Sequence, residues 1–210
     1  MEDKVLEMIS ATMTSLKETT SFAILTVVAI AISKTQKEEK VKIGSLEIIK
    51  EYAGIMLFAT LCSLIFQTLR LFNNLIALRS QLSPSTLDKA DFIIRANPWM
   101  FNPFSETNTS LSFLSDNLGF GFLLIIWWLG FHTGFSLLEQ SKRIWVLLGR
   151  FLSLLYLIFG LIIMILISQL IIEVNTQSVV KHIVLLLSIP IGALGVRKVY
   201  EYIDQIQSST

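Results

Sequence analysis

The sequence predicts an all-α fold, a polytopic transmembrane helical bundle of four to five spans that forms one membrane domain over residues 1–210. Two apolar runs carry this prediction. Residues 118–138 hold no formal charge, and residues 151–172 hold four polar side chains and no charged one. A helix rises about 1.5 Å per residue, so each run can cross a hydrocarbon core of roughly 30 Å. Inside lipid, a helix supplies every backbone amide of such a run with an internal partner.

Composition supports the same fold class. Hydrophobic residues make up 53% of the chain and charged residues 16%, whereas soluble domains carry about 25% charged residues. A net charge of +1, with no basic stripe, indicates that the chain does not bind nucleic acid directly. The single cysteine, Cys62, excludes an intrachain disulfide.

The apolar runs define five candidate spans. They are residues 19–33, 52–69, 118–138, 151–172 and 178–196. The first run is short, and the amphipathic stretch before it predicts an interfacial helix that leads into the membrane. The helical pattern of the second run continues through Leu78. In a four-span alternative, either 19–33 or 178–196 lies only at the membrane interface.

The one long polar connection, residues 80–117, predicts a short helix. Ser85 is the expected N-cap, with Asp88 three residues later completing a capping box, and the helix is expected to run to about Ala96. Two Asn-Pro pairs should then end the helix and impose extended turns, because proline disfavours the helical conformation of the residue before it. The pairs are Asn97-Pro98 and Asn102-Pro103.

The distribution of basic residues predicts the orientation. With five spans, the 34–51 loop, the 139–150 turn and the C-terminal tail lie on one side and carry ten basic residues, against seven on the other side. The positive-inside rule then places the lysine-rich loop, the turn and the C-terminus in the cytoplasm.

The second run carries a polar face. Its members are spaced three or four residues apart and share one side of a helix: Thr60, Ser63, Gln67, Arg70 and Asn74. One interpretation is a water-filled pore or gate. The interpretation that we favour is a seam between helices, with Arg70 reaching the headgroups.

Small residues form stripes along the last three spans. The glycines expected to pack against neighbouring helices are Gly119, Gly130, Gly134, Gly149, Gly160, Gly192 and Gly195. Such spacing lets helix backbones approach closely, so it predicts a tight bundle with self-association.

Basic residues gather on the predicted cytoplasmic side. These are Lys34, Lys37, Lys40, Lys42, Lys142, Arg143 and Arg150. Attraction to anionic membrane lipids is the common role of such a cluster, and docking of a cytoplasmic protein partner is the alternative.

No pattern indicates enzymatic chemistry, so we expect a non-enzymatic protein with no catalytic residue, cofactor or metal site. The chain lacks HExxH, a glycine-rich phosphate loop and G-x-S-x-G, and two histidines with one cysteine cannot form a usual zinc site. His132, the one histidine deep in a span, is expected to be a packed residue rather than a proton relay.

The layout resembles the membrane subunit of the Kiwa anti-phage defence system, a family of small bacterial membrane proteins. The short first span followed by the lysine-rich stretch 34–50 carries the resemblance, together with the segment Asn97-Pro-Trp-Met-Phe-Asn-Pro-Phe104. The resemblance implies a homo-oligomeric sensor in the bacterial inner membrane that docks a soluble, DNA-acting effector on its cytoplasmic face. It carries over no functional residue, and five spans depart from the family plan of about four.

Two other functions fit the same residues. A small pore-forming channel or effector would use the polar face of the second span. A toxin-immunity membrane protein would use packed helices and exposed loops, as a sensor does.

Overall fold

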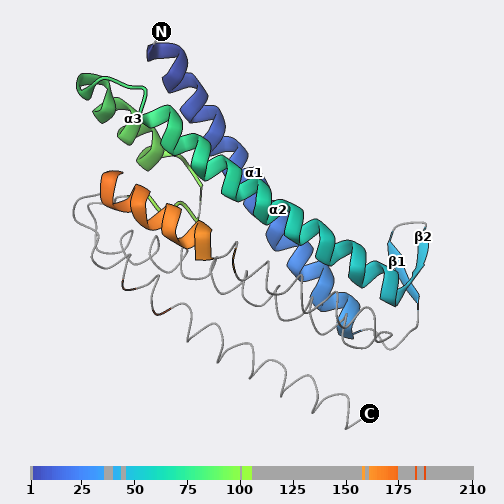
Figure 1. The fold of residues 1–210 in the computed structure, drawn as a ribbon. Coiled ribbons are helices and arrows are strands. Elements are labelled where there is room, and N and C mark those ends of the chain that lie inside the picture. The colour runs from blue at the N-terminus through green and yellow to red at the C-terminus, as the bar shows by residue number, and fades with distance from the viewer. Residues whose placement is uncertain are drawn as a thin grey trace.

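The computed structural model describes residues 2–35, 40–43, 46–99, 101–105, 158, 161–174, 183 and 187. The described part is helical apart from one short β-hairpin, which confirms the helical character of the predicted fold (Figure 1). In chain order the elements are α1 (Glu2–Thr35), β1 (Lys40–Ile43), β2 (Leu46–Ile49), α2 (Lys50–Arg79), α3 (Pro84–Ala96) and an apolar helix Leu161–Val174. Among these residues one stretch, Ile55–Arg79 of α2, is long and apolar enough to cross a membrane.

Helix α1 is one continuous helix of 34 residues, about 51 Å long at 1.5 Å per residue. It contains both the expected interfacial helix and the first candidate span. The hydroxyl groups of its buried threonines donate hydrogen bonds to backbone carbonyls one turn earlier in the same helix. Thr12 donates to the Met8 carbonyl at 2.8 Å and Thr20 to the Leu16 carbonyl at 2.7 Å. These polar side chains therefore lie in the buried seam without leaving an unpaired donor there.

Helices α1 and α2 pack side by side in opposite directions (Figure 1). Fully buried side chains at helical spacing form the seam: Ile9, Met13 and Leu16 from α1, with Leu61, Ile65, Phe72 and Leu75 from α2. Asn74 Nδ2 donates to Thr12 Oγ1 at 3.5 Å and marks which levels of the two helices face each other.

The lysine-rich connection between α1 and α2 contains an antiparallel hairpin, which corrects the expectation of a plain loop. Lys40 pairs with Ile49 and Ile43 with Leu46. The physical reason is visible in the chain, because two short runs with strand-forming residues are separated by two residues that begin with Gly44. That separation favours a tight turn between paired strands.

Helix α3 begins two residues earlier than expected. Its N-cap is Ser83 and Pro84 occupies the first turn, so the predicted capping box of Ser85 and Asp88 is wrong. Proline suits the first helical position because its fixed φ matches the helix and its missing N–H would be unpaired there. The Ser83 side chain makes no capping hydrogen bond to the backbone.

The carboxylate of Glu2, from the first turn of α1, binds the start of α3 instead. Its Oε1 accepts a hydrogen bond from the Ser83 backbone N–H at 3.1 Å, and its Oε2 accepts one from the Thr86 hydroxyl at 2.5 Å. These bonds, that from Thr86 first, lower the pKa of Glu2 from its ordinary value of 4.5. A negative charge at this position also suits the positive end of the α3 dipole.

The end of α3 at Ala96 agrees with the prediction, and Asn97 is extended as expected before Pro98. The Asn102 side chain returns to this helix end, where its Nδ2 donates to the Ile94 carbonyl at 2.8 Å. Its Oδ1 accepts from the Phe104 backbone N–H at 3.0 Å. The turn thereby satisfies a carbonyl of the last helical turn and fixes the buried Phe104 ring.

Candidate functional site

Apart from Asn74, the polar face of α2 lies away from its seam with α1. Its five predicted members are all exposed: Thr60, Ser63, Gln67, Arg70 and Asn74. The α1 seam instead uses the apolar face that contains Leu61 and Ile65. The Thr60 hydroxyl donates to the Met56 carbonyl of its own helix at 2.9 Å. Asn74 contacts α1, because its Nδ2 donates to Thr12 Oγ1 at 3.5 Å.

Two open cavities meet on this face at Arg70 and Asn73. The first, the polar cavity, has a volume of about 490 Å³ and is lined by Gln67, Arg70, Leu71, Asn73, Asn74 and Ala77. The second, the apolar cavity, has a volume of about 390 Å³ and is lined by Phe66, Leu69, Arg70, Asn73, Ile162 and Leu166. Helix Leu161–Val174 thus forms one wall of the apolar cavity beside α2.

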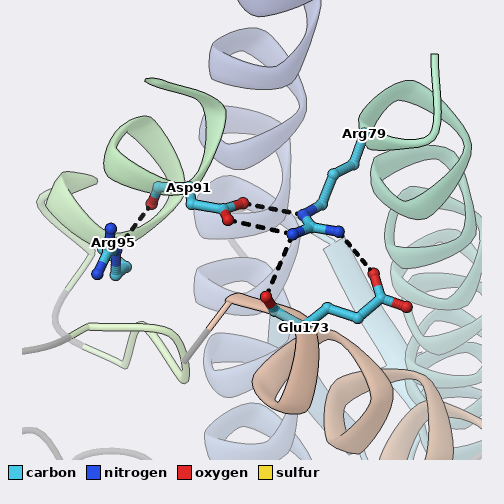
Figure 2. Close-up of polar contacts among 4 residues, drawn as sticks. All are labelled: Arg79, Asp91, Arg95 and Glu173. Atoms are coloured by element: carbon cyan, nitrogen blue, oxygen red, sulfur yellow. Dashed lines mark hydrogen bonds and ion pairs between the residues drawn. The ribbon is translucent and has the colours of Figure 1, made fainter. Parts of the chain in front are cut away.

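Arg79, in the last turn of α2, is the centre of a charged cluster (Figure 2). Its Nε donates to Asp91 Oδ1 at 2.9 Å and its Nη2 to Asp91 Oδ2 at 3.1 Å, a bidentate pair with α3. Its Nη1 donates to Glu173 Oε2 at 2.9 Å, and its Nη2 also reaches the Glu173 backbone carbonyl at 3.2 Å. Arg95 Nε donates to the Asp91 backbone carbonyl at 3.2 Å.

This cluster joins three helices at one point. Arg79 lies in the last turn of α2 and contacts both the side chain and the backbone carbonyl of Glu173 in helix Leu161–Val174, so this helix, α2 and α3 meet at one guanidinium. The C-terminal end of a helix carries partial negative charge and unpaired carbonyls, which a cation there stabilises. The Arg79 and Asp91 side chains are 15% and 12% exposed and that of Glu173 is 48% exposed. The cluster is therefore a structural clamp, shielded on its Asp91 side.

This cluster was not predicted from the sequence, although a signal for two of its members was present in the chain. Glu173 follows directly on the uncharged run 151–172, and Arg79 ends the helical apolar pattern of the second run, which continues beyond Arg70. The second and fourth spans of an alternating topology run in the same direction, so their ends share one side of the membrane. Asp91 gave no such signal, because the contact depends on how α3 packs.

Other predicted residues are placed only in part. Lys34 lies in the last turn of α1, and Lys40 and Lys42 lie on β1. The remaining basic residues, Lys37, Lys142, Arg143 and Arg150, lie outside the described residues. So do all the predicted packing glycines: Gly119, Gly130, Gly134, Gly149, Gly160, Gly192 and Gly195. His132 is outside them as well.

Within the part of the chain that the structure describes, no group of three or more His, Cys, Asp or Glu side chains could hold a metal ion. Comparison with models of protein families gives no match. Neither the curated proteins nor the solved structures give a significant match. The geometry above is therefore the basis for a functional proposal.

Proposed function

We propose that this protein is a non-enzymatic, polytopic membrane subunit, with residues 19–33 of α1 and residues 52–69 of α2 embedded in lipid. The observation that carries the proposal is a change along the exposed face of α1. Up to residue 18 that face carries charged side chains: Asp3, Lys4, Glu7, Lys17 and Glu18. Beyond it, apart from Ser21, the exposed side chains are large and apolar: Phe22, Leu25, Val28 and Ile32, each between 47% and 63% exposed. Such an exposed apolar stripe is unfavourable in water and favourable in lipid.

The uncharged stretch of α2 ends at the same level of the helix pair as the charged half of α1. Six residues along α1 from Thr12 is Glu18, and six residues back along α2 from its partner Asn74 is Thr68. Arg70 is the first charged residue after Glu51. The uncharged stretches 19–33 and 52–69 therefore lie beside each other. At 1.5 Å per residue they are about 22 and 27 Å long, close to the thickness of a hydrocarbon core of roughly 30 Å.

This alignment supports a specific orientation. The β1–β2 hairpin, with Lys40 and Lys42, extends from one end of the helix pair, while α3 lies at the other end (Figure 1). Arg79 is in the last turn of α2, so it lies at the same end as α3. The positive-inside rule favours the hairpin end for the cytoplasm. A two-stranded hairpin offers backbone edges on which an extended segment of a partner can pair.

The function that fits this arrangement is that of a homo-oligomeric sensor or scaffold in the bacterial inner membrane. Its cytoplasmic hairpin docks an effector protein, and its C-terminus lies in the cytoplasm. The resemblance to the Kiwa membrane subunit supports a place in anti-phage defence. Measurement of the particle mass in mild detergent, with crosslinking in cells, tests this level of the proposal. A monomer from which no partner is recovered would exclude it.

Two matched lysine substitutions on α1 test the membrane embedding. Leu25→Lys places a charge on the proposed lipid face and should disfavour insertion by about 3 kcal/mol. Met8→Lys replaces an exposed apolar side chain in the charged half of the same helix and should change stability by less than about 0.5 kcal/mol. We expect carbonate-washed membranes to retain the wild type and Met8→Lys, and to retain much less Leu25→Lys. Recovery of the wild type in the supernatant, or equal behaviour of the two variants, would contradict the embedding.

A second function, a small pore, is favoured by one observation. Ser63 and Gln67 are polar, exposed and within the uncharged part of α2. Several copies of α2 around one axis would place these groups against water. Conductance in planar bilayers should then fall in Gln67→Leu and Arg70→Leu, and unchanged conductance would exclude the pore.

A further inference from the structure

The two cavities at Arg70 have opposite chemistry and form one continuous surface. Arg70 and Asn73 line both of them. On one side the wall adds the amides of Gln67 and Asn74, and on the other side it adds Phe66, Leu69, Ile162 and Leu166. A ligand that fits both must therefore be polar at one end and apolar at the other. Each cavity alone has the volume of an ordinary small-molecule pocket, about 300–1,000 Å³.

The polar cavity has the charge of an anion site. Arg70 has no ion-pair partner among the described residues, whereas Arg79, two and a half turns further along α2, is paired with both Asp91 and Glu173. Of the described residues that line either cavity, none is acidic. A guanidinium presents a planar fork that matches phosphate oxygens, and neighbouring amide side chains can donate to the same group.

The apolar and polar ends of this surface are ordered along the proposed membrane normal. Arg70 is the first charge after the uncharged stretch 52–69, so it lies at the level of lipid phosphates. Phe66 lies one turn closer to the membrane interior than Arg70. Ala77, in the polar cavity, lies two turns further out. The order of chemistry along the groove is that of a phospholipid in the adjacent leaflet.

We propose that this surface binds one anionic phospholipid. Its phosphate lies against Arg70 and Asn73, and one acyl chain lies against Phe66, Leu69, Ile162 and Leu166. The lipid then fills the open face between α2 and helix Leu161–Val174. The inference rests on the proposed membrane embedding.

Lipid binding to the full chain in nanodiscs tests the proposal. The probes are phosphatidylglycerol and phosphatidylcholine with identical acyl chains, and retained lipid is measured by native mass spectrometry after release. Arg70→Gln removes the charge and keeps a polar side chain. Lys17→Gln is the matched control, because Lys17 is an exposed cation at nearly the same level of α1 but lines neither cavity.

We expect the wild type to prefer phosphatidylglycerol, and Arg70→Gln to weaken its binding at least fivefold, while Lys17→Gln changes it less than twofold. Ile162→Gln, at a position that is already exposed, should weaken both lipids by interrupting the acyl wall. Inorganic phosphate should compete poorly, because it lacks the acyl chain. Equal losses in Arg70→Gln and Lys17→Gln, no preference between the lipids, or displacement by millimolar phosphate would overturn the proposal. A chain that is not retained in membranes at all would instead refute the proposed function, so the two failures are distinguishable.

Discussion

Removal of Arg79 is the sharpest test of the way the helices are held together. Arg79→Met keeps a long apolar stem but leaves the Asp91 carboxylate, 12% exposed, without its bidentate partner. Breaking a fully buried pair costs about 3–5 kcal/mol, and an exposed pair contributes about 0.2–1 kcal/mol. Because the cluster is shielded at Asp91 and open at Glu173, we expect about 3 kcal/mol for Arg79→Met, about 2 kcal/mol for Asp91→Asn and under about 1 kcal/mol for Glu173→Gln.

Thermal unfolding of the detergent-purified protein, followed by tryptophan fluorescence, measures these differences. For a chain of this size 1 kcal/mol corresponds to about 2–4 °C, so Arg79→Met should lower Tm by about 6–12 °C. The double variant Arg79→Met with Asp91→Leu removes both charges and should recover part of that loss. A loss in Glu173→Gln as large as that in Asp91→Asn would refute the assignment of the stabilisation to the shielded side. Strict additivity of the Arg79 and Asp91 variants would refute their coupling.

Three further predictions concern the packing around α3 and the helix seam. Glu2→Gln should remove a pH dependence: the lowered pKa of Glu2 means that its contribution is present above pH 4.5 and is lost as pH falls through the lowered value, so wild-type and variant Tm should converge in acid and differ at pH 7. Asn102→Ala should cost about 1 kcal/mol through the unpaired Ile94 carbonyl, measured by Tm, and an unchanged Tm would contradict this role. Leu75→Ala, at a side chain with no exposure in the α1 seam, should cost about 2–5 kcal/mol, and a cost below 1 kcal/mol would show that the seam is not tightly packed.

Local patterns in the chain were enough to predict the helical character and the end of α3. The continuation of α2 through Leu78 follows from its apolar period, and the stop at Ala96 follows from the proline after Asn97. Both depend on residues that are neighbours in the chain. The hairpin between Lys40 and Ile49 was missed, although its short runs and two-residue separation are a recognised local signal.

The other differences arise from contacts between distant segments. The carboxylate at the N-terminus of α3 belongs to Glu2, 81 residues away from Ser83 in the chain. The local pattern around α3 contains no sign of this contact, and the capping box predicted at Ser85 was wrong. The Arg79 cluster likewise depends on a residue 94 positions away. The polar face of α2 was recognised as a face, but its position relative to the α1 seam depends on which side of α2 buries Leu61 and Ile65.

The two acidic partners of Arg79 are made at different times during synthesis. Asp91 follows it by 12 residues and emerges from the ribosome shortly afterwards, whereas Glu173 follows by 94 residues. The α1–α2 pair can therefore bind α3 early. Two of the four hydrogen bonds that the guanidinium donates go to Glu173, in a segment translated much later. Docking of helix Leu161–Val174 then completes a junction that was half assembled, which gives the growing chain a defined order in which its parts join.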